Sequence, residues 1–363
     1  MGPVTDQAPS DVLEGVLSLA DLEVLAAERL SAVALAYVSG GAWDESTLAE
    51  NVAAFRRRRL WPRVLVDVSR VDTRVRLLGR EASMPVGLAP AAQQGLCHTE
   101  AELATTRAAA SAGIPSVLST FSTVSMEEVA AAAPGADRWF QLYVHHDRGI
   151  TADLVARAAA AGFRVLVVTV DLPVIGYRQR EIALGSTPAE RLGSLEAYRQ
   201  PDATLQDVLA GHIDASFDWA DLERLAADSP LPVVVKGILR TDDARRAVDR
   251  GARGIIVSNH GGRQLDRVPA TIDALEPVAQ AVVGTGTEVY LDGGVRRGLD
   301  VATALALGAR AVFLGRPYLY ALAIDGERGV ARALAHLRGE LERTMALLGA
   351  PGLADLDRSL VTE

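Results

Sequence analysis

Eight short runs of apolar, largely β-branched residues recur from about residue 85 onward, separated by Ala-rich amphipathic stretches. The runs cover residues 85–90, 116–119, 139–143, 165–170, 233–236, 254–258, 289–292 and 311–315. Their apolar character is continuous rather than alternating, which is typical of parallel strands buried on both faces. Eight strands that alternate with helices predict an α/β fold, the (β/α)8 TIM barrel.

The stretches between these runs carry helix signals. We expect helices over residues 99–112, 151–161, 221–227, 241–250 and 299–307. Ser125 and Glu128 match a capping box at the start of another helix, and Gly162, Gly251 and Gly308 match glycine C-caps. An open doubly wound sheet is the alternative architecture, but no glycine-rich dinucleotide-binding fingerprint follows the first run, which favours the barrel.

Two segments fall outside the repeat. One precedes the barrel and contains a predicted helix at 19–34 and a predicted loop at 37–44. The other lies between the fourth and fifth strands, and its length is typical of a lid. We therefore expect one domain, 1–363, made of an N-terminal helical segment (1–75), the barrel (85–350) and a lid-like insertion (181–218).

Composition narrows the class of protein. A net charge of −9 argues against a nucleic-acid partner or an anionic membrane, and no apolar run approaches the length of a membrane span. The N-terminus lacks the pattern of a secretory signal. Cys97 is the only cysteine, so a cytoplasmic setting is expected. No spacing of histidine, cysteine and carboxylates resembles a metal site, and no metal is expected.

One basic residue stands apart from the others. Of the 37 lysines and arginines, only Lys236 is a lysine, and it directly follows an apolar run. Arginine replaces lysine readily on a surface, but not where a compact ammonium is needed. Lys236 is therefore a candidate site residue, the alternative being a solvated lysine at a strand end.

Polar side chains fall where the predicted strands end, which is where a TIM barrel places its site. After strands seven and eight come Asp292-Gly-Gly-Val-Arg-Arg-Gly298 and Leu314-Gly-Arg-Pro317. Glycines let backbone N–H groups approach an anion, and arginine adds a bidentate charge. These turns predict a phosphate site; the alternative is two ordinary glycine turns with solvated arginines.

The segment after strand six, Ser258-Asn-His-Gly-Gly-Arg-Gln-Leu-Asp266, carries the most chemistry. His260 is a natural base near neutral pH, and Arg263 is a natural clamp for a carboxylate. This pair suits a 2-hydroxy acid, whose hydroxyl gives up a proton while its carboxylate is held. Asp171 could stabilise the imidazolium, and Arg178 could be a second carboxylate ligand. The other five histidines are expected to be structural.

With these motifs the chain resembles the FMN-dependent 2-hydroxy-acid oxidases and dehydrogenases, a family that includes glycolate, lactate and hydroxymandelate oxidases and mandelate dehydrogenase. The resemblance extends over about residues 18–350. It is carried by residues 258–266, 291–298 and 315–317, and by Phe140-Gln-Leu-Tyr143, Thr169-Val-Asp171 and Val235-Lys-Gly237.

The resemblance implies where FMN binds. The flavin is expected against Pro90, Ala91, Ala92, Ser119, Gln141, Thr169 and Ser258. Lys236 is expected at the pyrimidine end of the ring, where its charge favours the reduced, anionic flavin. The ribityl phosphate is expected at Asp292, Gly294, Arg296, Gly315 and Arg316.

The resemblance also implies substrate contacts, from Tyr37, Tyr143, Arg178 and Arg263. His260 is expected as the base, with Asp171, Lys236 and Tyr143 as its catalytic neighbours. Phe121 stands where glycolate oxidases have a tryptophan, which predicts a roomier substrate pocket. The segment from Tyr37 to Leu48 is one residue longer than in the family pattern, and Tyr177 replaces a residue that is more often basic or polar.

The implied reaction is oxidation of an (S)-2-hydroxy acid to the 2-oxo acid, with O2 as acceptor and H2O2 as product, in a homotetramer. Alternatives are a dehydrogenase with another acceptor and a tailoring oxidase of a larger, peptide-derived substrate. An FMN-dependent isomerase would need a diphosphate site. A Schiff-base aldolase would use Lys236 as nucleophile, which leaves His260 and Arg263 without a role.

Overall fold

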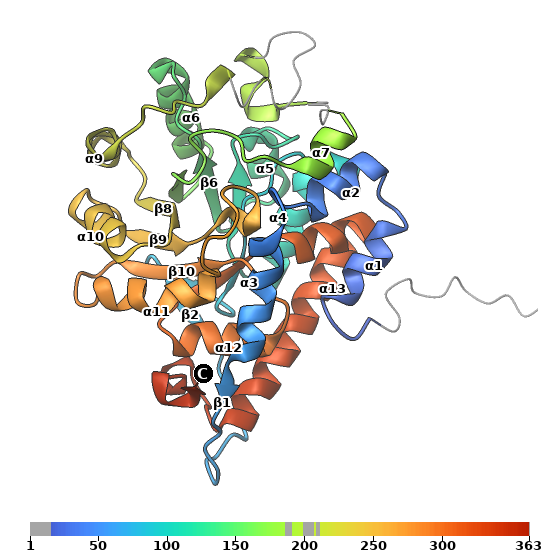
Figure 1. The fold of residues 1–363 in the computed structure, drawn as a ribbon, viewed down its shortest axis with the longest axis vertical. Coiled ribbons are helices and arrows are strands. Elements are labelled where there is room, and N and C mark those ends of the chain that lie inside the picture. The colour runs from blue at the N-terminus through green and yellow to red at the C-terminus, as the bar shows by residue number, and fades with distance from the viewer. Residues whose placement is uncertain (1–15, 186–190, 199–206, 208–210, 363) are drawn as a thin grey trace, which may run out of the picture.

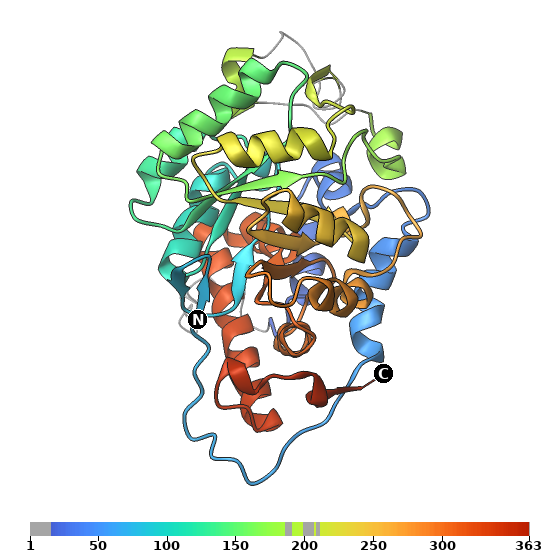
Figure 2. The same ribbon diagram turned by 90° about the vertical axis from the view of Figure 1, so that its left-hand side faces the viewer.

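Eight parallel strands close into a barrel in the order β10-β11-β4-β5-β6-β7-β8-β9 (Figures 1 and 2). The computed structural model describes residues 16–185, 191–198, 207 and 211–362. The strands are β4 (Val86–Leu88), β5 (Ser116–Ser119), β6 (Arg138–Leu142), β7 (Val165–Thr169), β8 (Val233–Ile238), β9 (Gly254–Val257), β10 (Glu288–Asp292) and β11 (Ala311–Leu314). Each matches one predicted strand, and the barrel rather than the open sheet is confirmed.

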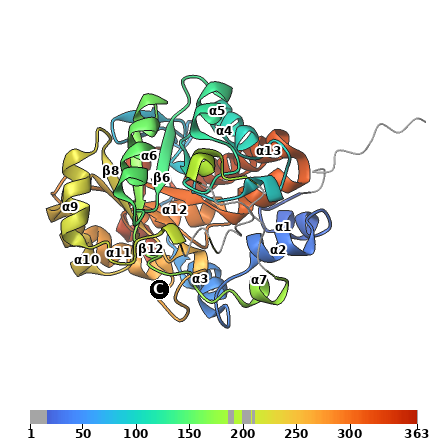
Figure 3. The ribbon, with the colours of Figure 1, turned by 90° about the horizontal axis from the view of Figure 1, so that it is seen from above.

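Helices surround the barrel, as the view from above shows (Figure 3). They are α4 (Ala101–Ala112), α5 (Met126–Ala132), α6 (Arg148–Ala160), α9 (Trp219–Asp228), α10 (Thr241–Asp249), α11 (Thr271–Ala281), α12 (Gly298–Ala306) and α13 (Arg316–Leu348). The six that the sequence predicted are present, including the capping box of α5. We did not predict α11, which contains Pro277, nor α13, which is broken at Asp325 and Gly326.

The barrel interior is filled by aromatic side chains rather than left open. The rings of Trp139, Tyr290 and Phe313 pack with centroids 5.3–5.7 Å apart. Gly87 makes room for this cluster, because a Cβ there would lie 2.5 Å from the Phe313 ring. The interior is thus a packed core, and ligands are confined to the strand ends.

A hairpin packs against the amino-terminal end of the barrel. Its strands are β2 (Val75–Leu77) and β3 (Arg80–Ala82), and Leu77 is fully buried. The backbone N–H of Leu78 donates to both carboxylate oxygens of Glu288, at 3.1 Å each. The hairpin therefore covers the amino-terminal end of the barrel, opposite the carboxyl ends of the strands.

The N-terminal segment differs from the prediction. Instead of one helix at 19–34 there are two, α1 (Asp21–Ala27) and α2 (Ala32–Ser39). The Ser31 hydroxyl accepts a hydrogen bond from the Ala34 N–H at 3.2 Å and so starts a new helix. Tyr37 consequently lies in the last turn of α2, and its prediction as part of a loop was wrong.

A third N-terminal helix, α3 (Ser46–Arg57), is capped by a residue far along the chain. Glu45, which precedes it, is left-handed and offers no side-chain cap. The carboxylate of Asp266 instead accepts from the N–H groups of Ser46 at 3.2 Å and Thr47 at 2.7 Å. Asp266 thereby ties the end of the 258–266 segment to α3.

Only part of the predicted lid is described. The short helix α7 (Gln179–Ala183) and a 3-10 segment (Gly193–Tyr198) belong to it, whereas residues 186–190, 199–206 and 208–210 lie outside the described residues. The lid therefore stays a prediction. Among the helices described, none has the length and apolarity needed to cross a bilayer.

Asp266→Ala should lower the free energy of unfolding by about 1–2 kcal/mol, because two N–H groups of α3 lose their acceptor. Asp44→Ala is the matched control: Asp44 is 63% exposed and pairs with the exposed Arg267 at 2.8 Å, so its loss should cost less than about 0.5 kcal/mol. Urea unfolding measures both. Equal effects of the two substitutions would contradict the capping role.

Candidate active site

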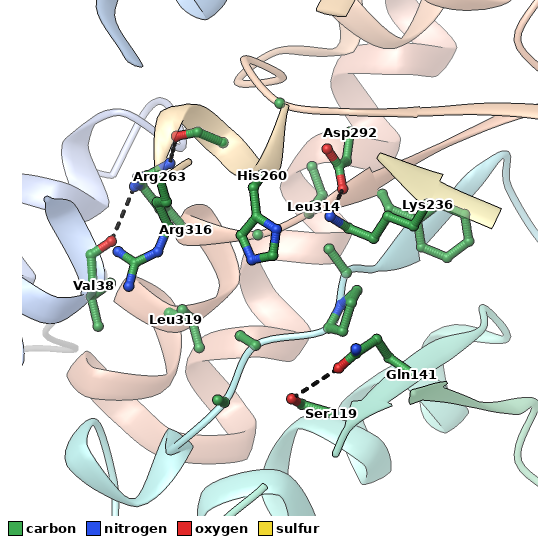
Figure 4. A pocket seen from close by; sticks show the side chains of 18 of the residues that line it. Val38, Ser119, Gln141, Lys236, His260, Arg263, Asp292, Leu314, Arg316 and Leu319 are labelled. Carbon is green, nitrogen blue, oxygen red and sulfur yellow. Dashed lines mark hydrogen bonds and ion pairs between the residues drawn. The ribbon is translucent and has the colours of Figure 1, made fainter. Parts of the chain in front are cut away.

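A cavity opens at the carboxyl ends of the barrel strands (Figure 4). Every residue that the sequence proposed for the site lines it, except Asp171 and Ser258, which lie one layer behind. The sequence reasoning missed several lining residues, chiefly small or apolar ones: Val38, Ala89, Gly261, Gly293, Val295, Phe313, Leu314 and Leu319.

His260 occupies the centre of the cavity (Figure 4). Its backbone is left-handed, with φ 57°, and its Nδ1 lies 2.8 Å from Oδ1 of Asp171. Gly237 makes this contact possible, since a Cβ there would lie 2.6 Å from the Asp171 Cβ. With Nδ1 engaged, Nε2 faces Tyr143, whose hydroxyl is 3.4 Å away.

Burial keeps the His260 imidazole neutral. Burial lowers its pKa and outweighs the carboxylate of Asp171, which acts in the opposite direction. Burial alone would raise the pKa of Asp171, but His260 and Lys236 lower it overall. A neutral imidazole oriented by an ionised carboxylate can accept a proton at Nε2. Burial also raises the pKa of Tyr143, whose hydroxyl therefore stays protonated.

Lys236 forms the opposite wall (Figure 4). Its ammonium donates to the Ser258 hydroxyl at 2.9 Å and lies 3.4 Å from Oδ2 of Asp292. Burial alone would lower its pKa, but Asp292 and Asp171 outweigh burial and raise it. Lys236 is therefore a buried cation, and Ser258 positions it; the same hydroxyl accepts from the His260 N–H at 3.1 Å.

Arg178 and Arg263 form a second charged group beside His260. Arg178 donates from Nε to the Arg263 carbonyl at 3.3 Å, and Arg263 donates to the carbonyls of Tyr37 and Gly40. The Arg263 guanidinium also lies over the Tyr37 ring, 5.0 Å from its centroid. Two adjacent guanidiniums in a cavity wall can hold a carboxylate.

Arg296 and Arg316 give the far end of the cavity a positive charge. Burial lowers the pKa of both, that of Arg316 to about 9. Within the described residues neither forms an ion pair; Arg316 donates to the carbonyls of Val38 and Gly261 at 3.0 and 2.9 Å. Arg316 also begins α13, and a helix N-terminus beside partly buried cations suits a phosphate.

Three buried polar atoms in the wall have no hydrogen-bond partner among the described residues: Nε2 of Gln141, Oγ1 of Thr169 and Oδ1 of Asp292. The other end of the Gln141 amide is engaged, because its Oε1 accepts from Ser119 at 3.2 Å. Buried polar groups rarely stay unpaired. Their presence in the wall indicates a bound molecule with several hydrogen-bonding edges.

A TIM barrel whose cavity brings together a neutral imidazole, two guanidiniums suited to a carboxylate and a positive end suited to a phosphate has the features of an enzyme of small acids with a phosphate-bearing cofactor. Comparison with known proteins agrees. The family described as FMN-dependent dehydrogenase matches residues 26–363, and the chain belongs to this family. FMN is the cofactor of this family, and the flat ring and phosphate of FMN fit the unpaired edge atoms and the two partly buried arginines.

Individual relatives cover nearly the whole chain. Glycolate oxidase 3 of Oryza sativa subsp. indica is 46% identical, over 96% of this chain and 97% of its own length. The L-lactate oxidase of Nostoc sp. is 47% identical, over 95% and 98%. A crystal structure of mandelate oxidase, 42% identical, superposes with a TM-score of 0.89 over 95% of this chain and 98% of that one.

Two further residues that the sequence did not single out contact the arginines. Gln264 accepts from Arg178 Nη2 at 3.4 Å and donates to the Asp171 carbonyl at 3.1 Å. Glu181 lies 3.1 Å from Arg263 Nη2. Gln264 is inside the 258–266 motif and could have been found there, whereas Glu181 follows an irregular segment without a pattern.

We expect the pKa of His260 to lie below 6.5 and to fall further in Asp171→Asn, because a neutral amide stabilises the imidazolium less than a carboxylate does. NMR titration of histidine-labelled protein measures this. The chain has six histidines, and His260→Gln assigns the signal by its loss. An unchanged or higher pKa in Asp171→Asn would contradict the assigned pair.

Proposed function

We propose that the protein oxidises an (S)-2-hydroxy acid to the 2-oxo acid and passes the electrons to O2, which yields H2O2. The observation that carries this proposal is the meeting of a neutral His260, backed by Asp171, with two guanidiniums in one cavity. A base and a carboxylate clamp side by side are what a 2-hydroxy acid requires.

Residues on three sides of the cavity would hold FMN. Gln141, Thr169 and Asp292 offer unpaired polar atoms to the ring edge, and Lys236 supplies a buried positive charge. The sequence placed Asp292 at the phosphate instead; its ion pair with Lys236 favours the ring. Pro90, Ala91, Ala92 and Ser119 would contact the ring, and Gly294, Arg296, Gly315 and Arg316 the phosphate. When bound, FMN supplies the two-electron acceptor for the reaction.

The remaining residues would act on the substrate. Arg178 and Arg263 bind the carboxylate and thereby set the orientation of the hydroxyl-bearing carbon. Nε2 of His260 accepts a proton from the substrate, and Asp171 stabilises the imidazolium that forms. The Tyr143 hydroxyl, 3.4 Å from Nε2, donates a hydrogen bond at this position, and Tyr37 closes the pocket beside Arg263.

Lys236 argues against the Schiff-base alternative. A nucleophilic amine must be neutral, and the carboxylates of Asp292 and Asp171 raise the pKa of Lys236. The relatives are oxidases by name, which supports O2 over another acceptor. A cytoplasmic location and a homotetramer stay predictions, resting on composition and on the family resemblance.

We propose that the substrate is bulkier than glycolate. Phe121 stacks on Tyr143 with ring centroids 5.3 Å apart and an interplanar angle of 28°. It lines the cavity at the position where the resemblance to glycolate oxidases implies a larger indole. The space left by the smaller ring would admit an aryl side chain. One mandelate oxidase structure that this chain resembles was solved with (S)-4-hydroxymandelic acid.

The purified protein should be yellow, and (S)-mandelate should bleach it under anaerobic conditions faster than glycolate does. Admission of air should restore the colour with one H2O2 per substrate. Glycolate, L-lactate and (S)-mandelate, compared by stopped-flow absorbance, form the panel, and the (R)-enantiomers are the controls. A protein that binds no FMN, or that no 2-hydroxy acid reduces, would refute the proposal; recoloration only by an added dye would identify a dehydrogenase.

His260→Gln should keep FMN bound and slow anaerobic reduction by about 10²–10⁴-fold, since the proton acceptor is lost. Arg263→Lys should raise KM and also slow reduction, because a point charge lacks the bidentate geometry of the guanidinium. FMN content by absorbance separates these effects from loss of cofactor. Reduction of His260→Gln at the wild-type rate would show that another group is the base.

A further inference from the structure

Glu181 is a buried carboxylate that has no part in the mechanism described so far. It lies on α7, is 4% exposed, and α7 packs against α2. One oxygen, Oε1, lies 3.1 Å from Nη2 of Arg263 and 3.7 Å from Nη1 of Arg178. The same atom therefore contacts both guanidiniums that would bind the substrate carboxylate.

The two guanidiniums repel each other in a buried setting. The pKa of Arg178 is lowered to about 10, first by burial and then by Arg263, and Glu181 acts in the opposite direction. Two adjacent buried cations are costly unless an anion compensates them. Glu181 compensates one of the two charges before any substrate arrives.

The other partners of these arginines are uncharged. Arg178 donates to the Gln264 side chain and the Arg263 carbonyl, and Arg263 donates to two backbone carbonyls. Among the described residues, Glu181 is the only carboxylate within ion-pair distance of either guanidinium. Asp171 is ionised beside His260 and Lys236 and, among the described residues, forms no ion pair with either arginine. A third guanidinium, Arg316, donates to the same Gly40 carbonyl as Arg263, and under the proposed function the FMN phosphate would balance its charge. Arg178, Arg263 and Glu181 then carry one net positive charge together.

We infer that Glu181 is a positioning residue that sets the carboxylate subsite to accept one negative charge, and so selects monocarboxylic over dicarboxylic 2-hydroxy acids. One substrate carboxylate balances the cluster, because two anions then face two cations. A second carboxylate would be buried without a partner, which is unfavourable. This inference rests on the proposed function, which places the substrate carboxylate at Arg178 and Arg263.

Oxamate and oxalate test it directly, because they have nearly the same shape and differ by one charge at neutral pH. Isothermal titration of the FMN-loaded protein gives the dissociation constants of both. In Glu181→Gln the preference for oxalate over oxamate should rise by about tenfold relative to wild type, since the cluster then carries two positive charges. Glu181→Asp keeps the charge and should keep the wild-type preference within about threefold.

The control is Glu127→Gln, which removes an exposed carboxylate paired with Arg157 at 2.9 Å and should leave the preference unchanged. If Glu181 has a merely structural role, its substitution should weaken the binding of oxamate and of oxalate equally and leave the preference between them unchanged. That result would overturn the inference. The titration needs no turnover, so it is distinct from a failure of the proposed oxidation, which the reduction of wild type reports.

Should Glu181→Gln fail to fold, Arg263→Gln and the double variant Glu181→Gln/Arg263→Gln carry the same test. In Arg263→Gln the remaining pair, Arg178 and Glu181, has no net charge, so the preference should shift towards oxamate by about fivefold. The double variant restores one positive charge and should return the preference to within about threefold of wild type. A double variant that behaves like Arg263→Gln alone would overturn the inference.

Discussion

The hydrogen bond between His260 and Asp171 is the contact on which the remaining geometry of the site depends. It joins the loop after β9 to the end of β7, and both ends require unusual backbone: a left-handed His260, and a glycine at position 237 where any side chain would displace Asp171. Once Nδ1 is fixed, Nε2 can face only Tyr143 and the cavity. The imidazole is therefore oriented by the scaffold before a ligand enters.

Around this contact the cavity is divided by charge. Lys236 is paired with carboxylates and fixed by Ser258, whereas Arg296 and Arg316 are partly buried and donate to backbone carbonyls. Carboxylates of the protein compensate the charge of Lys236. Among the described residues, no carboxylate forms an ion pair with Arg296 or Arg316. Under the proposed function, this difference separates a wall whose charge would act on the flavin from an end that would bind the flavin phosphate.

The strands and most of the site were predictable because both follow from local patterns. Buried parallel strands are continuous apolar runs, and barrel sites lie where those runs end, so Gln141, Lys236 and His260 could be found directly. The missed features depend on distant contacts: Asp266 caps a helix about 220 residues away, and Glu181 meets Arg263 across 82 positions. Ser31, which caps the second of the two N-terminal helices, is a local signal in the sequence. The apolar periodicity continues across it, so a single helix was predicted.

Lys236 has a consequence for the chemistry of the whole chain. It is the only lysine in 363 residues and its side chain is almost fully buried. No other side chain of this sequence carries an amine that an acylating reagent could modify. Any acylation of a lysine is thus a modification of the cavity wall, and the peptide that contains Lys236 reports by itself how often this wall is exposed to solvent.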